Sequence, residues 1–207
     1  MNIELLISQF IVLWAVIDPI GTIPVFIAVT KGYTDKEKNS IARSASIVAF
    51  IILLFFALVG EFLLGKVGVP LAAFQTSGGV ILFMFAMNMI FGDSKPEEEL
   101  QMIKKSEKET AIFPLAIPSI AGPGAILALV LLAETKNVNM KGFALLIGLL
   151  LIILFINYLL MRGSTKIHKY LGNSGAIVIS KVMGLILASM AANNILMGIK
   201  EFFKIKV

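Results

Sequence analysis

The chain alternates between long apolar segments and short polar ones. The apolar runs occupy about 3–30, 44–65, 70–92, 110–133, 142–161 and 176–199. Roughly 20 apolar residues in an α-helix span the hydrocarbon core of a bilayer, and each run reaches that length. None of the runs shows the strict alternation of apolar and polar residues that is typical of a membrane barrel strand. The pattern therefore predicts an all-α membrane protein with six transmembrane helices.

Two of these runs are interrupted near their middle by proline and glycine. The first contains DPIGTIP at 18–24, and the fourth contains PSIAGPG at 118–124. Proline breaks a helix interior because it lacks the N–H group and its ring clashes with the preceding turn, but it is tolerated at the first helical position. Asp18 directly precedes Pro19 and is a suitable N-cap. We therefore expect helices one and four to be discontinuous, with a second half-helix after each break.

The two halves of the chain resemble each other at a nearly constant offset. Gly79, Ala86 and Asn88 in the third run match Gly184, Ala191 and Asn193 in the sixth, each at an offset of 105 residues. Pro19 and Pro123 in the two breaks match at an offset of 104. Each half has an odd number of spans, so the second half must insert upside down. This predicts two inverted three-helix repeats, at about 1–92 and 110–207, which a charged cytoplasmic linker at about 93–109 joins into one transmembrane domain.

Composition agrees with a membrane protein and excludes several other classes. Hydrophobic residues make up 58% of the 207 residues and charged residues 15%, against about 45–50% and about 25% in soluble domains. This excludes a disordered chain, a coiled coil and a nucleic-acid-binding protein. The chain has no cysteine and a single histidine, so a disulfide framework and a metal cluster are not expected. Ser119 has no obvious basic partner, and we expect neither an enzyme nor a bound cofactor.

Lysine and arginine are distributed unevenly between the two sides of the predicted membrane domain. Of the 18 basic residues, twelve lie in the loops after the first, third and fifth runs, and six lie on the other side. Cytoplasmic loops carry an excess of lysine and arginine. The distribution therefore predicts a multi-pass protein of the cell membrane whose two termini both lie outside.

The two breaks are the candidate binding site. A half-helix that starts inside the bilayer directs its positive end and its free N–H groups towards the membrane centre, and such ends bind carboxylates. The candidate substrate-binding residues are Asp18, Pro19, Gly21, Thr22, Ser119, Ala121, Gly122, Gly124, Asn88 and Asn193. Other roles stay open: capping for the aspartate, bonding of the hydroxyls to their own helix, and contacts between helices for the two asparagines. Two simple proline kinks are the alternative to a site.

The segments around the breaks also carry a family resemblance. IDPIGTIPVF in the first run and PLAIPSIAGPGAI in the fourth resemble the signature segments of the MarC family of six-helix integral membrane proteins. The resemblance extends over the whole chain in length, span count and the position of both motifs. It implies two inverted three-helix repeats, a central site at the breaks in helices one and four, and transport of small neutral amino acids.

These observations together predict a secondary transporter for a small amino acid such as glycine or alanine. The substrate carboxylate would bind near Gly21, Thr22, Gly122 and Gly124, and its ammonium group would bind Asp18 or the carbonyls freed by the breaks. The chain has no nucleotide-binding motif, so an ion gradient, of protons through Asp18 or of sodium, would drive transport. Export of other small solutes or drugs, a membrane-embedded enzyme and a scaffold remain as alternatives. The oligomeric state is left open, with a homo-oligomer as one option.

Overall fold

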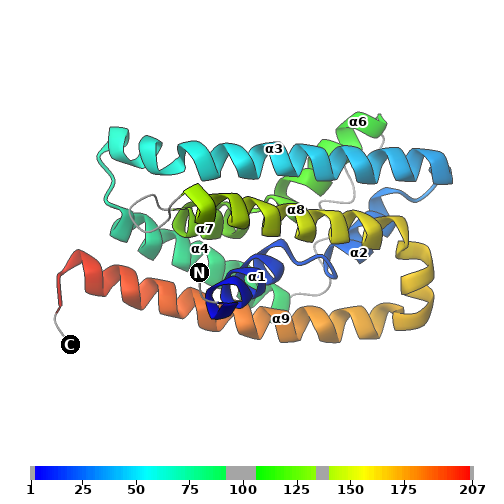
Figure 1. Ribbon diagram of the computed structural model, residues 1–207. Helices are drawn as coiled ribbons and strands as arrows, with labels where there is room; N and C mark the ends of the chain where they lie inside the picture. Colours follow the sequence, from blue (N-terminus) through cyan, green and yellow to red (C-terminus); the bar gives the residue numbers. More distant parts are fainter. Residues whose placement is uncertain (1–2, 92–105, 134–139, 206–207) are drawn as a thin grey trace.

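The computed structural model describes residues 3–91, 106–133 and 140–205. Within these ranges the regular structure is helical throughout, without a strand, so the predicted all-α class is confirmed. The elements, shown in Figure 1, are α1 (Ile3–Ile17), α2 (Thr22–Val29), α3 (Asp35–Val67), α4 (Leu71–Phe91), α6 (Glu107–Thr110), η1 (Ala111–Ile120), α7 (Pro123–Leu132), α8 (Met140–Arg162) and α9 (Ser164–Phe202). Most of the predicted linker at 93–109 lies outside the described residues.

Three helices are long and apolar enough to cross a membrane on their own. These are α3 with 33 residues, α4 with 21 and α8 with 23. The segment Glu107–Ile120 and α7 together pass the same test as one span that is bent by 58°. Several membrane-spanning helices are therefore present among the described residues, in agreement with the coarse prediction.

Local sequence signals set the ends of the longest apolar helix, α3. The Thr34 side chain accepts a hydrogen bond from the backbone N–H of Glu37, and the Glu37 side chain accepts one from the backbone N–H of Thr34. This reciprocal capping box satisfies two N–H groups that the first helical turn leaves unpaired. Gly68 ends the helix in the left-handed conformation, with φ of 75°, which glycine adopts without steric cost.

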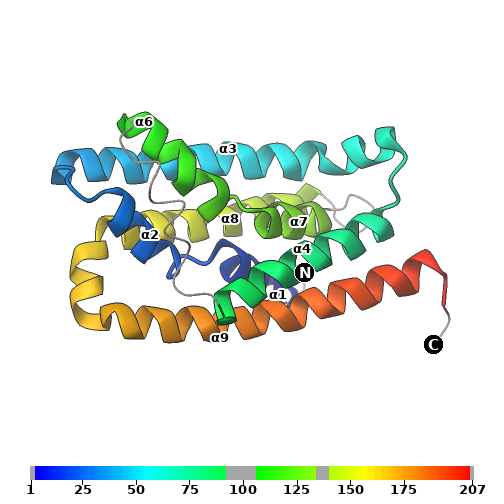
Figure 2. The ribbon, with the colours of Figure 1, turned by 180° about the vertical axis from the view of Figure 1, so that it is seen from behind.

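The halves of the chain pack into each other. The helix α3 packs against η1 and α7, which belong to the second half, and α8 packs against α1 and α2, which belong to the first. Figure 2 shows the same arrangement from behind. Each long helix therefore supports the interrupted segment of the other half.

The helices α4 and α9 form the most extensive contact between any two elements and pack along much of their length. A Cβ atom on Gly79 would lie 3.1 Å from the carbonyl oxygen of Ala191, and a Cβ atom on Gly184 would lie 3.2 Å from that of Ala86. The Cβ atom on Gly79 would also lie 2.8 Å from the Cγ1 atom of Ile195, and the Cβ atom on Gly184 would lie 2.9 Å from that of Ile90. Every residue in one contact is 105 positions from its counterpart in the other. The close approach of α4 and α9 is therefore reciprocal, and glycine permits it from both sides.

Candidate functional site

The first break separates α1 from α2 at residues 18–21. Asp18 is 3% exposed and has φ of 47°, a left-handed conformation that aspartate tolerates better than most residues. Its Oδ1 atom accepts a hydrogen bond of 2.9 Å from the backbone N–H of Gly21. Its backbone carbonyl accepts one of 3.1 Å from the N–H of Thr22. The side chain and the backbone of Asp18 thus stabilise the start of α2.

This arrangement differs in detail from the predicted cap. The expectation was that Asp18 would be the N-cap and Pro19 the first helical residue, but α2 begins at Thr22, after a turn at 19–21. The Asp18 carboxylate still accepts from an N–H group three residues later, as an N-cap side chain does. The Thr22 hydroxyl donates to the Asp18 carbonyl at 3.0 Å. Of the two predicted roles for this hydroxyl, bonding to its own helix is therefore the one observed.

Steric contacts within each break require glycine at positions 21 and 122. A Cβ atom on Gly21 would lie 2.6 Å from the Cγ atom of Asp18, which is closer than two carbon atoms can approach. A Cβ atom on Gly122 would lie 2.7 Å from the carbonyl oxygen of Pro118. The sequence predicts that the substrate carboxylate binds near these glycines. The structure gives each of them a reason within the fold.

The second break lies between η1 and α7. Backbone angles leave the helical range at Phe113, with φ of −131° and ψ of 124°, and at Ile117, with φ of −129° and ψ of 128°. Both residues precede a proline, and that position disfavours helical backbone. The helix α7 then begins at Pro123 with Gly122 as its N-cap, and no side chain caps it. The prediction that Pro123 starts a second half-helix is confirmed.

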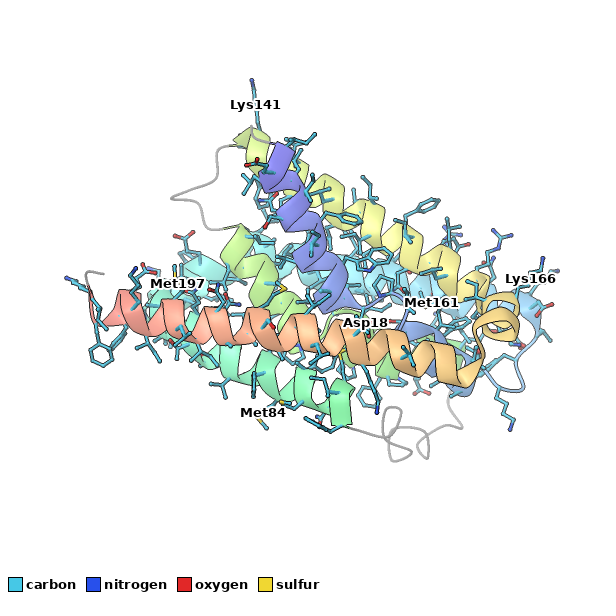
Figure 3. All side chains as sticks on the ribbon, turned by 90° about the horizontal axis from the view of Figure 1, so that it is seen from below. Asp18, Met84, Lys141, Met161, Lys166 and Met197 are labelled. Atoms are coloured by element: carbon cyan, nitrogen blue, oxygen red, sulfur yellow. The ribbon has the colours of Figure 1, made fainter. Side chains whose placement is uncertain are left out.

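The two interrupted segments lie side by side and run in opposite directions. The first half-helix α1 packs against α7, and the second half-helix α2 packs against η1. The hydroxyls of Tyr33, after α2, and Thr110, before η1, lie 3.3 Å apart and share a hydrogen bond. This contact places the end of the first interrupted segment next to the start of the second. Asp18 lies near the centre of the view in Figure 3, and Ser119 and Ala121, at the second break, are 9% and 1% exposed.

A cavity of about 380 Å³ opens beside the two breaks, among α1, α4, α7 and α9. Its lining residues are Val12, Val16, Leu82, Ala128, Leu131, Leu132, Ser189, Met190, Asn193 and Asn194. Val16 is two residues from Asp18, and Ala128 is one helical turn beyond Gly124. A Cβ atom on Gly124 would lie 2.6 Å from the Cδ1 atom of Leu82. The inner end of the cavity therefore lies within about one helical turn of each break.

The structure places the two predicted asparagines differently. Asn193 lines the cavity and forms part of its polar wall with Asn194 and Ser189. Asn88, its counterpart in the first half, does not line this cavity, although both asparagines are exposed. Of the ten candidate site residues, eight lie at or next to the two breaks, Asn193 lines the cavity, and Asn88 does neither.

Asn157 of α8 is not among the ten candidate site residues, and its sequence context makes it only a weaker candidate of the same kind as the other two asparagines. This side chain is fully buried, and neither its amide oxygen nor its amide nitrogen has a hydrogen-bond partner within the described residues. It shares the buried face of α8 with Leu150, Ile153 and Met161, and α8 packs against both α1 and α2. An amide within a long apolar run was the available signal, but such residues also commonly bond between helices.

Charged groups are scarce in the interior. Asp18 is the one acidic or basic residue that is buried among the described residues. No group of three or more histidine, cysteine, aspartate or glutamate residues in the described part of the chain is arranged to hold a metal ion. The chemistry that this region offers is therefore hydrogen bonding by backbone and amide groups, together with one carboxylate.

Comparison with known proteins assigns the chain to a family. Residues 3–203 match the family described as MarC family integral membrane protein. A UPF0056 membrane protein of Pyrococcus horikoshii is 36% identical, over 96% of this chain and 98% of its own length. UPF0056 membrane protein YvbG of Bacillus subtilis is 34% identical over 99% of both chains, and a UPF0056 membrane protein of Methanocaldococcus jannaschii is 34% identical over 97% and 98%. No solved structure matches the chain.

Proposed function

The chain belongs to the MarC family of integral membrane proteins, and we propose that it is a secondary transporter of small neutral amino acids such as glycine or alanine. The substrate would bind at the two breaks, near the middle of the membrane. The observation that carries this proposal is the pairing of the two interrupted helices, in which α1 packs against α7 and α2 against η1. Discontinuous helices in corresponding positions of two halves form the substrate site in many secondary transporters.

The two half-helix starts differ, and the difference suggests how a zwitterion would bind. The start of α2 is already next to a carboxylate, because Asp18 accepts the N–H of Gly21. Neither α2 nor α7 has a side-chain cap of its first helical N–H groups, but Gly122, the N-cap of α7, has no carboxylate three residues before it as Gly21 has. A helix leaves its first N–H groups without an acceptor inside the helix. We therefore assign the substrate carboxylate to the start of α7 near Gly122 and Gly124, and the substrate ammonium to Asp18.

The reciprocal packing of the halves supports the proposed inverted repeat. Gly79 approaches Ala191 as Gly184 approaches Ala86, and a single offset of 105 relates both contacts. Leu82 and Leu187 share this offset and are 1% and 0% exposed. Paired inverted halves can rock against each other around a central site, which is the usual basis of alternating access.

The cavity supports a small substrate. Its volume of about 380 Å³ lies at the lower end of the range for small-molecule sites, about 300–1,000 Å³. One wall is apolar and the other carries Asn193, Asn194 and Ser189. A short aliphatic side chain would contact the apolar wall, and the polar groups of the amino acid would reach the amides and the breaks. Asp18, as the buried carboxylate, is the proposed carrier of a coupling proton, with sodium as the alternative coupling ion.

Uptake into proteoliposomes tests the proposed function. Vesicles with the purified full-length chain are loaded with a proton or a sodium gradient, and the accumulation of labelled glycine and alanine is measured. We expect accumulation to depend on one gradient and to collapse with an ionophore that dissipates it. The variant Gly124→Val should abolish uptake because its side chain would displace Leu82 into the cavity. Gly148→Val on α8 is the matched control, since a Cβ atom there meets no atom within 4 Å. A wild-type protein that accumulates neither amino acid under either gradient would refute the proposal.

A further inference from the structure

A second hollow lies on the outer face between α3 and α8. It is a groove of about 510 Å³. The two helices run antiparallel beside each other in Figure 1. Both are long and apolar enough to span a membrane, so the groove faces the surrounding bilayer. The cavity described above is lined by other elements, and the groove is independent of it.

The α3 wall of the groove changes from polar to apolar along the helix. Arg43, Ser46, Ile47 and Phe50 line it, and their spacing of three and four residues places them on one helix face. The helix α3 is about 50 Å long at 1.5 Å per residue, which exceeds the roughly 30 Å hydrocarbon core. Its first ten residues carry most of its charges. Arg43 therefore lies at the level of the lipid headgroups, and Phe50 lies deeper, among the acyl chains.

The α8 wall follows the same gradient in the opposite chain direction. Leu151, Leu154, Phe155 and Tyr158 line it, again on one helix face. Leu154 is 3% exposed and Phe155 is 61% exposed, so the first forms the floor of the groove and the second its outer edge. Tyr158 lies near the Arg162 end of α8, and tyrosine favours the interface between membrane and water. Both walls thus place their polar groups at the same end of the groove.

At this end of the groove, Arg43 is the lining residue whose hydrogen-bond donors are available to a ligand. The Ser46 hydroxyl donates to the Ala42 carbonyl at 3.0 Å, and the Tyr158 hydroxyl donates to the Asn39 side-chain oxygen at 2.9 Å. Arg43 is exposed, and no ion pair joins it to a carboxylate of the described residues. A guanidinium carries five N–H donors in a planar fork that matches a phosphate.

We propose that this groove is a binding site for an anionic phospholipid. The Arg43 guanidinium binds the phosphate of the headgroup, and one acyl chain lies along Ile47, Phe50 and Leu151. Basic residues between membrane helices at the headgroup level are a known basis for recognising anionic lipids. Arg43, the one charged residue that lines the groove, and the apolar wall that follows it complement a ligand with a negative headgroup and a long hydrocarbon chain.

Native mass spectrometry of the purified full-length chain tests this site. The protein is titrated with phosphatidylglycerol and with phosphatidylcholine that carry the same acyl chains. We expect phosphatidylglycerol to bind about fivefold more tightly or better, because its headgroup carries a net negative charge whereas the choline ammonium of phosphatidylcholine balances the phosphate. Arg43→Gln should remove the preference, and Arg43→Lys should reduce it, because lysine keeps the charge and loses the fork. Lys66→Gln, at the other end of α3, is the matched control and should keep the preference.

The outcomes separate the proposal from its competitors. An unchanged preference in Arg43→Gln, or an equal loss in Lys66→Gln, would overturn it. Ile47→Trp fills the groove without touching Arg43 and should weaken the binding of both lipids; unchanged binding would also overturn the proposal. If inorganic phosphate displaces the lipid at millimolar concentration, the site recognises phosphate alone and a lipid is not its occupant. The melting temperature of each variant shows whether that variant is folded. If Arg43→Gln does not fold, the lipid binding of Arg43→Lys and Ile47→Trp tests the proposal in its place.

Discussion

Gly21 and Asp18 are matched to each other: the backbone N–H of Gly21 donates to the Asp18 carboxylate at 2.9 Å, and the Asp18 carboxyl group occupies the space where a Gly21 side chain would be. The carboxylate thus holds the turn that leads into α2 through the N–H of Gly21, the residue directly before the helix. Charge near the membrane centre costs about 2.5–3.5 kcal/mol on insertion scales. A hydrogen bond from a helix N-terminus returns part of this cost.

The first prediction tests this match. Gly21→Ala should lower the free energy of unfolding by about 1–3 kcal/mol, the usual cost of overpacking. In an Asp18→Gly background the same change should cost clearly less, because the clashing carboxyl group is gone and glycine tolerates the positive φ at position 18. Thermal unfolding of the four proteins in detergent measures the coupling. An equal loss in both backgrounds would show that Gly21 is needed for another reason.

The second prediction concerns the reciprocal contact of α4 and α9. Gly79→Ala and Gly184→Ala should both lower the melting temperature, and by similar amounts, because each new methyl group would press on a facing isoleucine and alanine carbonyl. A loss of about 1–3 kcal/mol is expected for each. Gly148→Ala on α8 is the control. It meets no atom within 4 Å and should be neutral or stabilising by up to about 1 kcal/mol, since alanine favours a helix. Tolerance of either first variant would contradict the reciprocity.

Sequence reasoning located both breaks because proline and glycine act on the backbone locally. Proline removes a donor wherever it stands, so the break before Thr22 and the start of α7 at Pro123 follow from the residues themselves. The role of Gly21 could not be predicted in this way. It depends on the rotamer of Asp18 and on its left-handed backbone, which the surrounding packing selects.

The location of the cavity could not be predicted from the sequence either. The offset of 105 residues suggested that Asn88 and Asn193 have similar surroundings, but a repeat constrains helix packing more closely than it constrains the space between helices. Both asparagines are exposed, but Asn193 lines the cavity and Asn88 does not. Asn157 was not predicted as a site residue because burial depends on which face of α8 meets α1 and α2. An apolar run such as FALLIGLLLIILFINYLL gives no periodicity from which that face can be read.

The third prediction uses the buried amide of Asn157. Burying an amide without hydrogen-bond partners costs about 1–3 kcal/mol, and leucine has the same branched shape and the same number of non-hydrogen side-chain atoms. Asn157→Leu should therefore raise the melting temperature. Tyr158→Phe is the matched control on the next residue, and it should lower stability by about 0.5–1.5 kcal/mol because it removes the 2.9 Å bond to Asn39. A lower melting temperature for Asn157→Leu would show that the amide has a partner in the folded protein.

The last prediction concerns the charge of Asp18. Asparagine is about as good a cap as aspartate, so Asp18→Asn should keep the hydrogen bond from Gly21 and change the melting temperature little. What the substitution removes is the negative charge. If that charge binds the substrate ammonium, the affinity for glycine should fall about tenfold or more, since a charged hydrogen bond contributes about 1.5–3 kcal/mol. If Asp18 carries the coupling proton, binding should persist while uptake driven by a proton gradient is lost. Equilibrium binding and proton-driven uptake are therefore measured on the same preparation of the variant, with Thr22→Val as a control that alters the break without changing its charge. Wild-type values for Asp18→Asn in both measurements would leave Asp18 as a cap alone, and the start of α7 would then have to bind the substrate without it.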